Sequence, residues 1–244
     1  MSTNPELPRA SQDAATESPD FDALAGATEA VRRVVTQLRR TQADASLLAE
    51  VERQANALAD RLEPFEYRGP YAQAELVMPD SPPSLDRAHG QPSRFFPYSP
   101  VVGPLNAIAP PVDFRLEGDE MLAEHVFDPQ YCGPPGSVHG GGIALVFDEL
   151  LGCLGAMLGI GGFTGTLEVK YRSLTPLHQP IRMRGWVERE EGSKIFIHGT
   201  FHTTDPGTEE RLCAEAKGIF IRPKQSVFED ARAKAVSARE AQIG

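Results

Sequence analysis

Cysteine is scarce in this sequence, and the three cysteines present, Cys132, Cys153 and Cys213, form no Cys-x-x-Cys pair. An odd number of cysteines cannot all be joined in disulfides within one chain, and free thiols are typical of a reducing compartment. Residues 1–20 also lack the basic segment followed by an apolar one that a secretory signal requires. We therefore expect a cytoplasmic protein.

Positive charge and long apolar runs are also lacking. The chain has 24 basic and 34 acidic residues, a net charge of −10. A nucleic-acid binder needs a basic surface, so we expect no nucleic-acid partner. The longest apolar run, residues 143–158, contains Asp148, Glu149 and several glycines. This run is too short and too charged to span a bilayer, so we expect no membrane partner.

Two common catalytic patterns are missing as well. Ser137 lies in Gly-Ser-Val-His and not in the Gly-x-Ser-x-Gly pattern of a nucleophile elbow, which excludes that type of serine hydrolase. The histidines form no His-Glu-x-x-His motif and no pairing with cysteine. We therefore expect no metal site and no cofactor.

The composition changes twice before residue 112. Residues 1–20 are polar, and we expect them to be disordered. Residues 21–62 repeat apolar side chains at helical spacing, which predicts one bent helix or a helical hairpin, with Asp44 or Ser46 as the second cap. Such an extension is most often a packing or oligomerisation element.

Residues 63–111 hold 11 of the 21 prolines. Proline fixes φ and lacks a donor, so we expect neither a helix nor a central strand here. An apolar cluster is nevertheless present: Phe95, Phe96, Tyr98, Val101 and Val102. The segment is therefore predicted to be an extended arm that lies on the main domain. Residues 225–244 are expected to be a polar tail or a helix.

Residues 112–224 have the pattern of an α+β domain. Apolar and polar residues alternate in six segments, at 112–117, 121–127, 163–172, 181–190, 194–204 and 211–221. Turn residues separate the last four segments, which predicts an antiparallel meander. Residues 139–158 form the long helical stretch between them, and it is apolar on every face, as a buried helix is. Six strands wrapped round one central helix make the hotdog fold.

Asp148 is the feature of this helix that needs an explanation. Asp148 and Glu149 are the only charges between His139 and Gly159, and an unpaired buried carboxylate is costly. Two interpretations remain open. In the first, both acids face an exposed strip or pair with an arginine such as Arg172 or Arg184. In the second, Asp148 lies at a cleft and acts as a general base or nucleophile.

The start of the same helix favours the second interpretation. Gly140, Gly141 and Gly142 have no Cβ to shield the first-turn amides, and the N-terminus of a helix suits an oxyanion. Close packing of helix against sheet is the alternative reason for these glycines. Gly140 and Asp148 are about 12 Å apart along a helix, too far for both to reach one carbonyl. Two antiparallel copies can share two sites, so the mechanism predicts a homodimer.

Two segments resemble a known family. The run GPPGSVHGGGIALVFDE, residues 133–149, and the run FTGTLEVKYRSLTPL from Phe163 are similar to the PaaI-like branch (phenylacetyl-CoA thioesterase type) of the hotdog thioesterases. The resemblance covers residues 112–223 and implies hydrolysis of an acyl-CoA to the free acid and CoA. Gly142 and Glu149 depart from the pattern of this branch.

The resemblance also implies a role for each matching residue. Asp148 activates water or attacks the thioester, the Gly140 and Gly141 amides polarise the carbonyl, His139 orients that turn, and Thr164 positions the water or Asp148. The assembly implied is a homodimer or a tetramer of hotdog subunits.

Substrate contacts are expected from three further sets of residues. Lys170 and Arg172 share one strand face and either bind CoA phosphates or belong to a solvated face. Glu149, the second acid, is also a substrate-binding candidate. An apolar tunnel between subunits is expected to hold the acyl chain, lined in part by Leu150, Leu151 and Leu154.

Two other functions remain to be tested. One is a non-catalytic protein that binds acyl-CoA or a protein partner, with the extension as its interaction module. The other is an enoyl-CoA hydratase, although the sequence lacks the Asp–His spacing of that chemistry.

Overall fold

The computed structural model describes residues 20–66, 73, 91–204 and 209–222. The expectations of disorder before residue 20 and of a tail or helix after residue 224 lie outside these residues, as do 67–72 and 74–90 of the expected arm.

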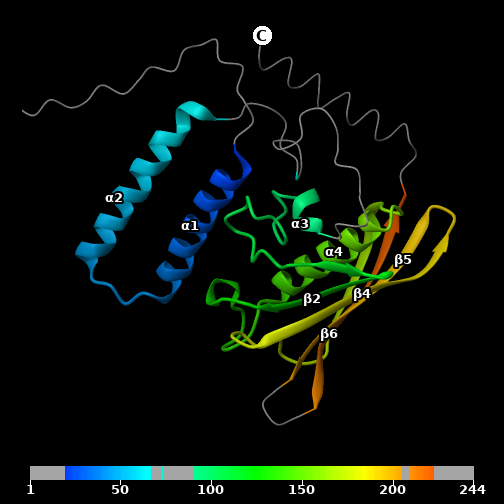
Figure 1. Cartoon of the computed structure of the whole chain (residues 1–244). Coiled ribbons are helices and arrows are strands. Elements are labelled where there is room, and N and C mark those ends of the chain that lie inside the picture. Colours follow the sequence, from blue (N-terminus) through cyan, green and yellow to red (C-terminus); the bar gives the residue numbers. More distant parts are fainter. Residues whose placement is uncertain (1–19, 67–72, 74–90, 205–208, 223–244) are drawn as a thin grey trace, which may run out of the picture.

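A six-stranded antiparallel sheet forms the body of the protein (Figure 1). Its strands are β1 Arg115–Glu117, β2 Glu120–Val126, β3 Phe163–Tyr171, β4 Pro180–Glu191, β5 Lys194–Thr204 and β6 Glu210–Ile221. Their order across the sheet is β1-β2-β4-β5-β6-β3. The first strand is shorter than predicted, but Val112 and Phe114 before it are still buried.

The predicted meander of four strands is wrong in one respect. β4, β5 and β6 do lie next to one another in chain order, but β3 pairs with β6 and β4 pairs with β2. Residues 172–179 carry the chain from β3 at one edge across to β4. Local sequence patterns indicate where strands lie along the chain, whereas strand neighbours depend on how the chain crosses the central helix.

The central helix, α4 Gly140–Met157, lies against one face of this sheet. Gly199 and Gly218 allow its close approach, because a Cβ at either position would lie 3.1 Å or 3.0 Å from a Leu151 methyl carbon. Nine residues of α4 are buried. The predicted hotdog fold is therefore present, and α4, although long and apolar enough for a membrane span, is its core helix.

Two details of the helix correct the sequence analysis. Leu150, Leu151 and Leu154 have no exposed surface, since they pack inside the subunit, so they are not available to line a tunnel between subunits. The helix is also not buried all round: Gly141 and Leu145 are exposed and Asp148 is half-buried. These three residues follow one another at helical spacing and form a stripe that the sheet leaves open.

Residues 21–62 form the helical hairpin that was one of the two predicted arrangements. It consists of α1 Phe21–Arg40 and α2 Ala45–Leu62, followed by a short 3₁₀ turn, η1 Glu63–Phe65. The side chains of Asp20 and Asp44 cap the two helices by accepting from Ala23 and Leu47 amides. α1 lies between α2 and the body of the protein (Figure 1).

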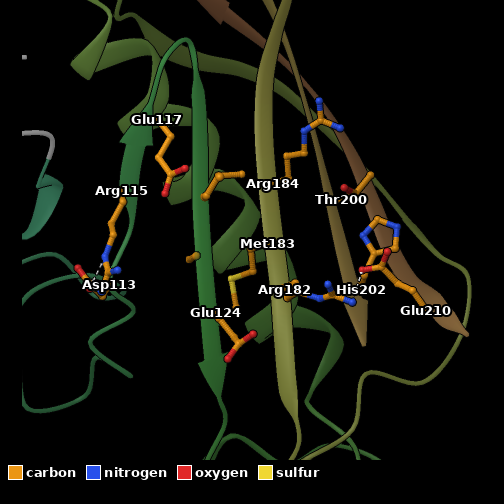
Figure 2. Close-up of a pocket in the computed structure, with 12 residues that line it drawn as sticks. Asp113, Arg115, Glu117, Glu124, Arg182, Met183, Arg184, Thr200, His202 and Glu210 are labelled. Carbon is orange, nitrogen blue, oxygen red and sulfur yellow. Dashed lines mark hydrogen bonds and ion pairs between the residues drawn. The ribbon is translucent and has the colours of Figure 1, made fainter. Parts of the chain in front are cut away.

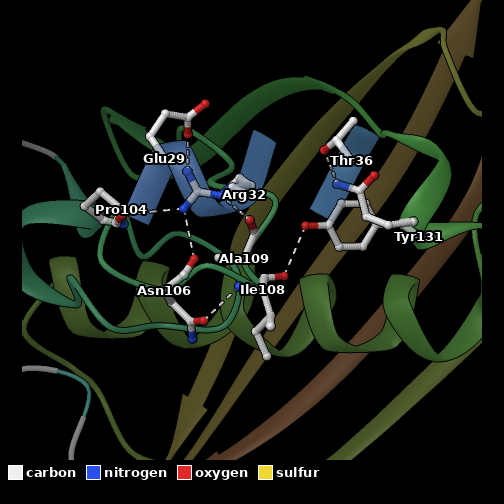
Figure 3. A network of polar contacts seen from close by, with 9 residues as sticks. Glu29, Arg32, Thr36, Pro104, Asn106, Ile108, Ala109 and Tyr131 are labelled. Atoms are coloured by element: carbon white, nitrogen blue, oxygen red, sulfur yellow. Dashed lines mark hydrogen bonds and ion pairs between the residues drawn. The ribbon is translucent and has the colours of Figure 1, made fainter. Parts of the chain in front are cut away.

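A buried arginine fastens α1 to the body. Arg32 points from α1 into a loop of backbone carbonyls, shown in Figure 3, and donates to Ala109 O at 3.0 Å and Asn106 O at 2.9 Å. It also contacts Pro104 O at 3.4 Å and forms an ion pair with Glu29. These bonds satisfy a charge that burial would otherwise penalise.

The described part of the arm, residues 91–111, lies on the main domain. Val101 and Val102 are buried and join the core that surrounds α4. The expectation that residues 63–111 contain no helix is wrong at two places, the 3₁₀ turn η1 and the single turn of α3 Pro92–Phe95. Proline is tolerated there because the first residue of a helix needs no N–H donor.

Ser99 organises this arm and joins it to α4. Its buried hydroxyl accepts from the amides of Val101 and Val102 and donates to the Glu149 carboxylate. Burial raises the pKa of Glu149, the Ser99 hydrogen bond opposes that effect, and the charge of Asp148 adds to it. The carboxyl next to Asp148 therefore serves as the attachment point of the arm.

We predict that Arg32→Ala lowers the free energy of unfolding by about 3 kcal/mol, because it leaves three carbonyls without their buried donor. Urea denaturation of the full chain measures the change. Arg33→Ala, on the same turn but exposed, is the control. Equal losses in the two variants would show that the Arg32 contacts contribute nothing.

We predict that Glu149→Gln stabilises the protein more at pH 8 than at pH 5. A folded pKa raised above the usual 4.5 means that Glu149 favours folding at low pH, and this contribution is lost as the pH rises through the folded pKa. The amide keeps an acceptor for Ser99 and removes the charge. We expect the melting temperature to rise by about 2–4 °C at pH 8.

Glu215→Gln is the control of opposite sign. The Arg172 hydrogen bond lowers the pKa of half-buried Glu215, so its contribution to folding is lost as the pH falls. The same gain for Glu149→Gln at both pH values would contradict the prediction.

Candidate active site

Asp148 and Thr164, two of the predicted site residues, are in direct contact. Thr164 Oγ1 donates to Asp148 Oδ1 at 2.8 Å. Asp148 lies on the open stripe of α4 and Thr164 is exposed on β3. One oxygen of the carboxylate thus accepts from the threonine. The other can accept from a water or attack the carbonyl carbon of a substrate.

A β-bulge at Gly165 gives Thr164 this orientation. Leu167, Val169 and Tyr171 point toward the α4 side of β3, so an unbroken alternation would turn residue 164 the other way. The register shifts between Thr164 and Thr166, and Thr164 pairs with buried Phe220. The extra residue of a bulge re-aims the side chain beside it. Gly165 suits the bulge, because a Cβ there would lie 2.9 Å from Ile221 Cγ1.

At the start of α4, the His139 side chain caps the helix. Its Nδ1 accepts from the Gly141 amide at 3.0 Å, and its own amide donates to Tyr131 O at 2.9 Å. An imidazole that accepts through Nδ1 carries its proton on Nε2 when neutral. The Nε2–H group is therefore the donor that exposed His139 has left for other partners.

The three glycine amides of the first turn are not equivalent. The Gly141 amide is engaged by His139, whereas those of Gly140 and Gly142 have no acceptor among the residues that the structure describes. A Cβ at Gly142 would meet nothing within 4 Å. The Gly142 amide is thus better placed than the Gly141 amide to donate to an oxyanion, although Gly142 departs from the family pattern. The role expected for Gly141 stays a prediction.

Tyr171 is a site residue that the sequence analysis missed. Its Oη donates to Gly140 O at 2.7 Å, and a Cβ on Gly140 would lie 3.4 Å from its ring. β3 therefore contacts α4 at both parts of the site, through Thr164 at Asp148 and through Tyr171 at Gly140. The signal was available, because Tyr171 lies between Lys170 and Arg172 and must face the other side of the strand.

Lys170 and Arg172 lie on the side of β3 that faces away from α4. Lys170 pairs with Glu168 at 3.1 Å, and Arg172 pairs with Glu215 at 2.5 Å. Both side chains are exposed, as the alternative of a solvated strand face predicted. Their expected contact with CoA phosphates stays a prediction. A CoA bound near Asp148 would have to extend round the edge of the sheet to contact them.

The structure does not bring Glu149 to the same place as Asp148. Its carboxylate is taken by Ser99 of the arm and lies 3.8 Å from Cys153 Sγ. The pairing of these acids with Arg172 or Arg184 is also wrong, since those arginines pair with Glu215 and Glu120. The structure therefore does not support direct substrate binding by Glu149, because its carboxylate is hydrogen-bonded to Ser99.

A hollow of about 650 Å³ lies on the other face of the sheet, over β1, β2, β4 and β5 (Figure 2). It contains none of the predicted site residues. Three arginines line it, and each pairs with an acid: Arg115 with Asp113, Arg182 with Glu210 and Arg184 with Glu120. It therefore offers no unpaired cation to a substrate phosphate.

One subunit thus carries two separated parts of a site. Asp148 with Thr164 supplies a carboxylate, and eight residues earlier the helix N-terminus supplies free amides. Because the helix is unbroken over Gly140–Met157, its N-terminus and Asp148 are about 12 Å apart along the axis. Among the described residues, no three His, Cys, Asp or Glu side chains gather as a metal site would require. Carboxylate, amides and hydroxyl are groups suited to acyl transfer.

Comparisons with known proteins agree with this fold. A family model described as "Thioesterase superfamily" matches residues 135–210. A crystal structure described as a thioesterase superfamily protein is 32% identical, covers 81% of this chain and 94% of its own, and has a TM-score of 0.67. Acyl-coenzyme A thioesterase THEM5 of Homo sapiens is 28% identical over 90 residues, 37% of this chain and 35% of that protein.

A second curated relative is acyl-coenzyme A thioesterase THEM4 of Xenopus laevis, 34% identical over 94 residues, 38% of this chain and 41% of that protein. The matches therefore span less than half the length of these curated relatives. The crystal structure, in contrast, is matched over nearly its whole length at 32% identity. By this match, and by the hotdog fold it shares, the chain belongs to the thioesterase superfamily.

Proposed function

We propose that the protein hydrolyses acyl-CoA thioesters to the free acid and CoA, as a PaaI-like thioesterase. The observation that carries the proposal is the Asp148–Thr164 hydrogen bond of 2.8 Å on the open stripe of α4. The names of the curated relatives support the substrate class. Three free cysteines support a cytoplasmic location.

Asp148 acts as the general base or as the nucleophile. As a base, its carboxylate takes a proton from water while the water oxygen attacks the thioester carbon. The oxyanion is stabilised by the amides at a helix N-terminus. Collapse breaks the C–S bond, and the CoA thiolate takes the proton from Asp148. As a nucleophile, Asp148 attacks the thioester carbon, the C–S bond breaks and the CoA thiolate leaves, which gives a mixed anhydride. Water then cleaves the anhydride to the free acid and the Asp148 carboxylate, and the proton released is taken by the thiolate. Thr164 orients the carboxylate in both cases.

The two parts of each site come from two subunits. Asp148 and the free amides of its own helix are too far apart for one thioester carbonyl to contact both. β3 is a nine-residue strand at the edge of the sheet, and none of its residues is buried. The free N–H and C=O groups of a long edge strand are a template for pairing with another chain. A homodimer joined at β3 and at the open stripe of α4 would bring each Asp148 toward the partner's helix N-terminus.

We predict that Asp148→Asn lowers kcat for acyl-CoA hydrolysis by about 100-fold or more, because the amide neither accepts the proton nor attacks. Release of free thiol from a panel of short, long and aromatic acyl-CoAs measures it. Glu168→Gln, on the opposite side of β3 from Thr164, is the matched carboxyl control and should retain activity. Equal hydrolysis by wild type and Asp148→Asn would remove Asp148 from the mechanism.

The same panel, extended by an enoyl-CoA, separates the rival functions. A protein that only binds acyl-CoA would be stabilised by the esters without releasing thiol. An enoyl-CoA hydratase would consume the enoyl absorbance without releasing CoA. Either result, obtained with well-folded wild type, would overturn the proposed hydrolysis.

We predict that two inactive variants restore activity when they share a dimer. Gly142→Asp puts a negative charge beside the oxyanion, and its Cβ has open space. In a heterodimer with Asp148→Asn, one shared site contains both changes and the other contains neither. Heterodimers purified with two different tags should therefore have about half the wild-type activity.

The control is each variant purified as a homodimer, which has both sites damaged. If each site were built within one chain, every site of the heterodimer would carry one damaging change. Heterodimers as inactive as the two homodimers would therefore rule out a shared site.

A further inference from the structure

The first turn of α4 begins with three consecutive glycines, Gly140, Gly141 and Gly142. Glycine loses more backbone freedom on folding than any other residue, so such a turn is poorly fixed by its own sequence. An oxyanion site needs the opposite property, because its donors must stay about 3 Å from the developing charge. Contacts from outside the three glycines must therefore fix this turn.

Two side chains bind the peptide group between Gly140 and Gly141. Tyr171 Oη donates to Gly140 O at 2.7 Å, and the Gly141 amide donates to His139 Nδ1 at 3.0 Å. A peptide group is planar, so two contacts at its opposite ends fix the direction of the whole plane. The free amides of the turn, those of Gly140 and Gly142, lie immediately before and after this plane in the chain. Their directions therefore depend on both contacts.

Tyr171 differs from a core tyrosine in its surroundings. Its side chain is 53% exposed, so it contributes little to the buried core. Its ring lies against Gly140, since a Cβ there would be 3.4 Å from Tyr171 Cζ. His139 belongs to the end of α4 itself, whereas Tyr171 belongs to β3. The Tyr171 hydroxyl is thus the contact through which the sheet fixes the first turn of the helix.

We propose that Tyr171 is a positioning residue for thioester hydrolysis: through Gly140 O it fixes the direction of the free Gly140 and Gly142 amides. This inference rests on the proposed function, and in it Tyr171 contacts no reacting atom. The oxyanion exists only in the transition state, so a loss of amide alignment lowers kcat and leaves KM nearly unchanged. A residue needed only for folding would not separate the two constants.

In this arrangement β3 serves two different sites of the proposed dimer. Thr164 orients the carboxylate of its own chain, and Tyr171 orients the amides of its own chain. These two parts of one chain are too far apart to act on one carbonyl. Tyr171 therefore acts in the same site as the partner's Asp148, and Thr164 acts in the other.

The test uses Tyr171→Phe in the full chain, because phenylalanine keeps the ring and removes only the hydroxyl. We expect kcat for acyl-CoA hydrolysis to fall about ten-fold and KM to stay within about two-fold of wild type. Ser173→Ala is the matched control. It also removes a hydroxyl-to-carbonyl bond, from Ser173 Oγ to Leu212 O at 2.8 Å, but this bond leads to β6 and not to α4. An unchanged kcat for Tyr171→Phe, or equal losses in the two variants, would overturn the proposal.

A second measurement needs no turnover. NMR relaxation with isotope-labelled glycine gives an order parameter for each glycine amide, about 0.85 for rigid backbone and below about 0.6 for flexible backbone. We expect the Gly141 and Gly142 amides to be rigid in wild type and flexible in Tyr171→Phe. Gly199, within strand β5, is the internal reference and should be rigid in both proteins.

The two readouts separate the positioning role from the proposed hydrolysis. Equal order parameters in wild type and Tyr171→Phe would overturn the positioning role, whatever the activity. Flexible amides in Tyr171→Phe, together with a wild type that releases no thiol, would refute the hydrolysis and still confirm that Tyr171 fixes the turn.

A heterodimer shows which part of the site Tyr171 serves. When Tyr171→Phe is paired with Asp148→Asn, one site has both changes and the other has neither, so we expect about half the wild-type activity. If Tyr171 acted on the carboxylate of its own chain, each site would carry one change, and about one-twentieth would remain. The lower value, where the heterodimer of Gly142→Asp with Asp148→Asn recovers activity, would overturn the assignment of Tyr171 to the amides.

Discussion

The close approach of α4 to the sheet is the constraint on which the rest of this structure depends. Gly199 and Gly218 have no Cβ where the Leu151 side chain lies, so the helix packs directly against the strands. This contact fixes the rotation of α4 about its own axis as well. The aliphatic side chains face the sheet, and the stripe that carries Asp148 is left open.

The edge strand β3 turns this open stripe into a candidate site. It contacts α4 near both of the separated parts, through Thr164 and through Tyr171. The bulge at Gly165 is needed for the first contact, because it changes which side of the strand Thr164 faces. The same strand has a long unpaired edge, which is why the site and the expected subunit interface lie together.

The extension is attached to this core by buried polar groups. Arg32 satisfies carbonyls of the arm, and Glu149 binds the arm through Ser99. Removing one partner of such a contact leaves a buried group unsatisfied, so the attachments are specific in position. The solved superfamily member aligns with 81% of this chain, far more than residues 112–224 can supply. The extension is thus no peculiarity of this protein.

The sequence by itself determined the elements and the chemistry of the candidate site. Periodicity located the helices and strands, and the Asp148 carboxylate and the first-turn glycines on one apolar helix indicated an acyl-transfer site, because both signals are local in the chain. Tertiary structure alone decided the neighbours of β3, the side of Thr164 and the partner of Glu149. Those outcomes depend on contacts between segments far apart in the sequence, and no periodicity within one segment records them. The Ser99–Glu149 bond, across 50 positions, is the clearest example.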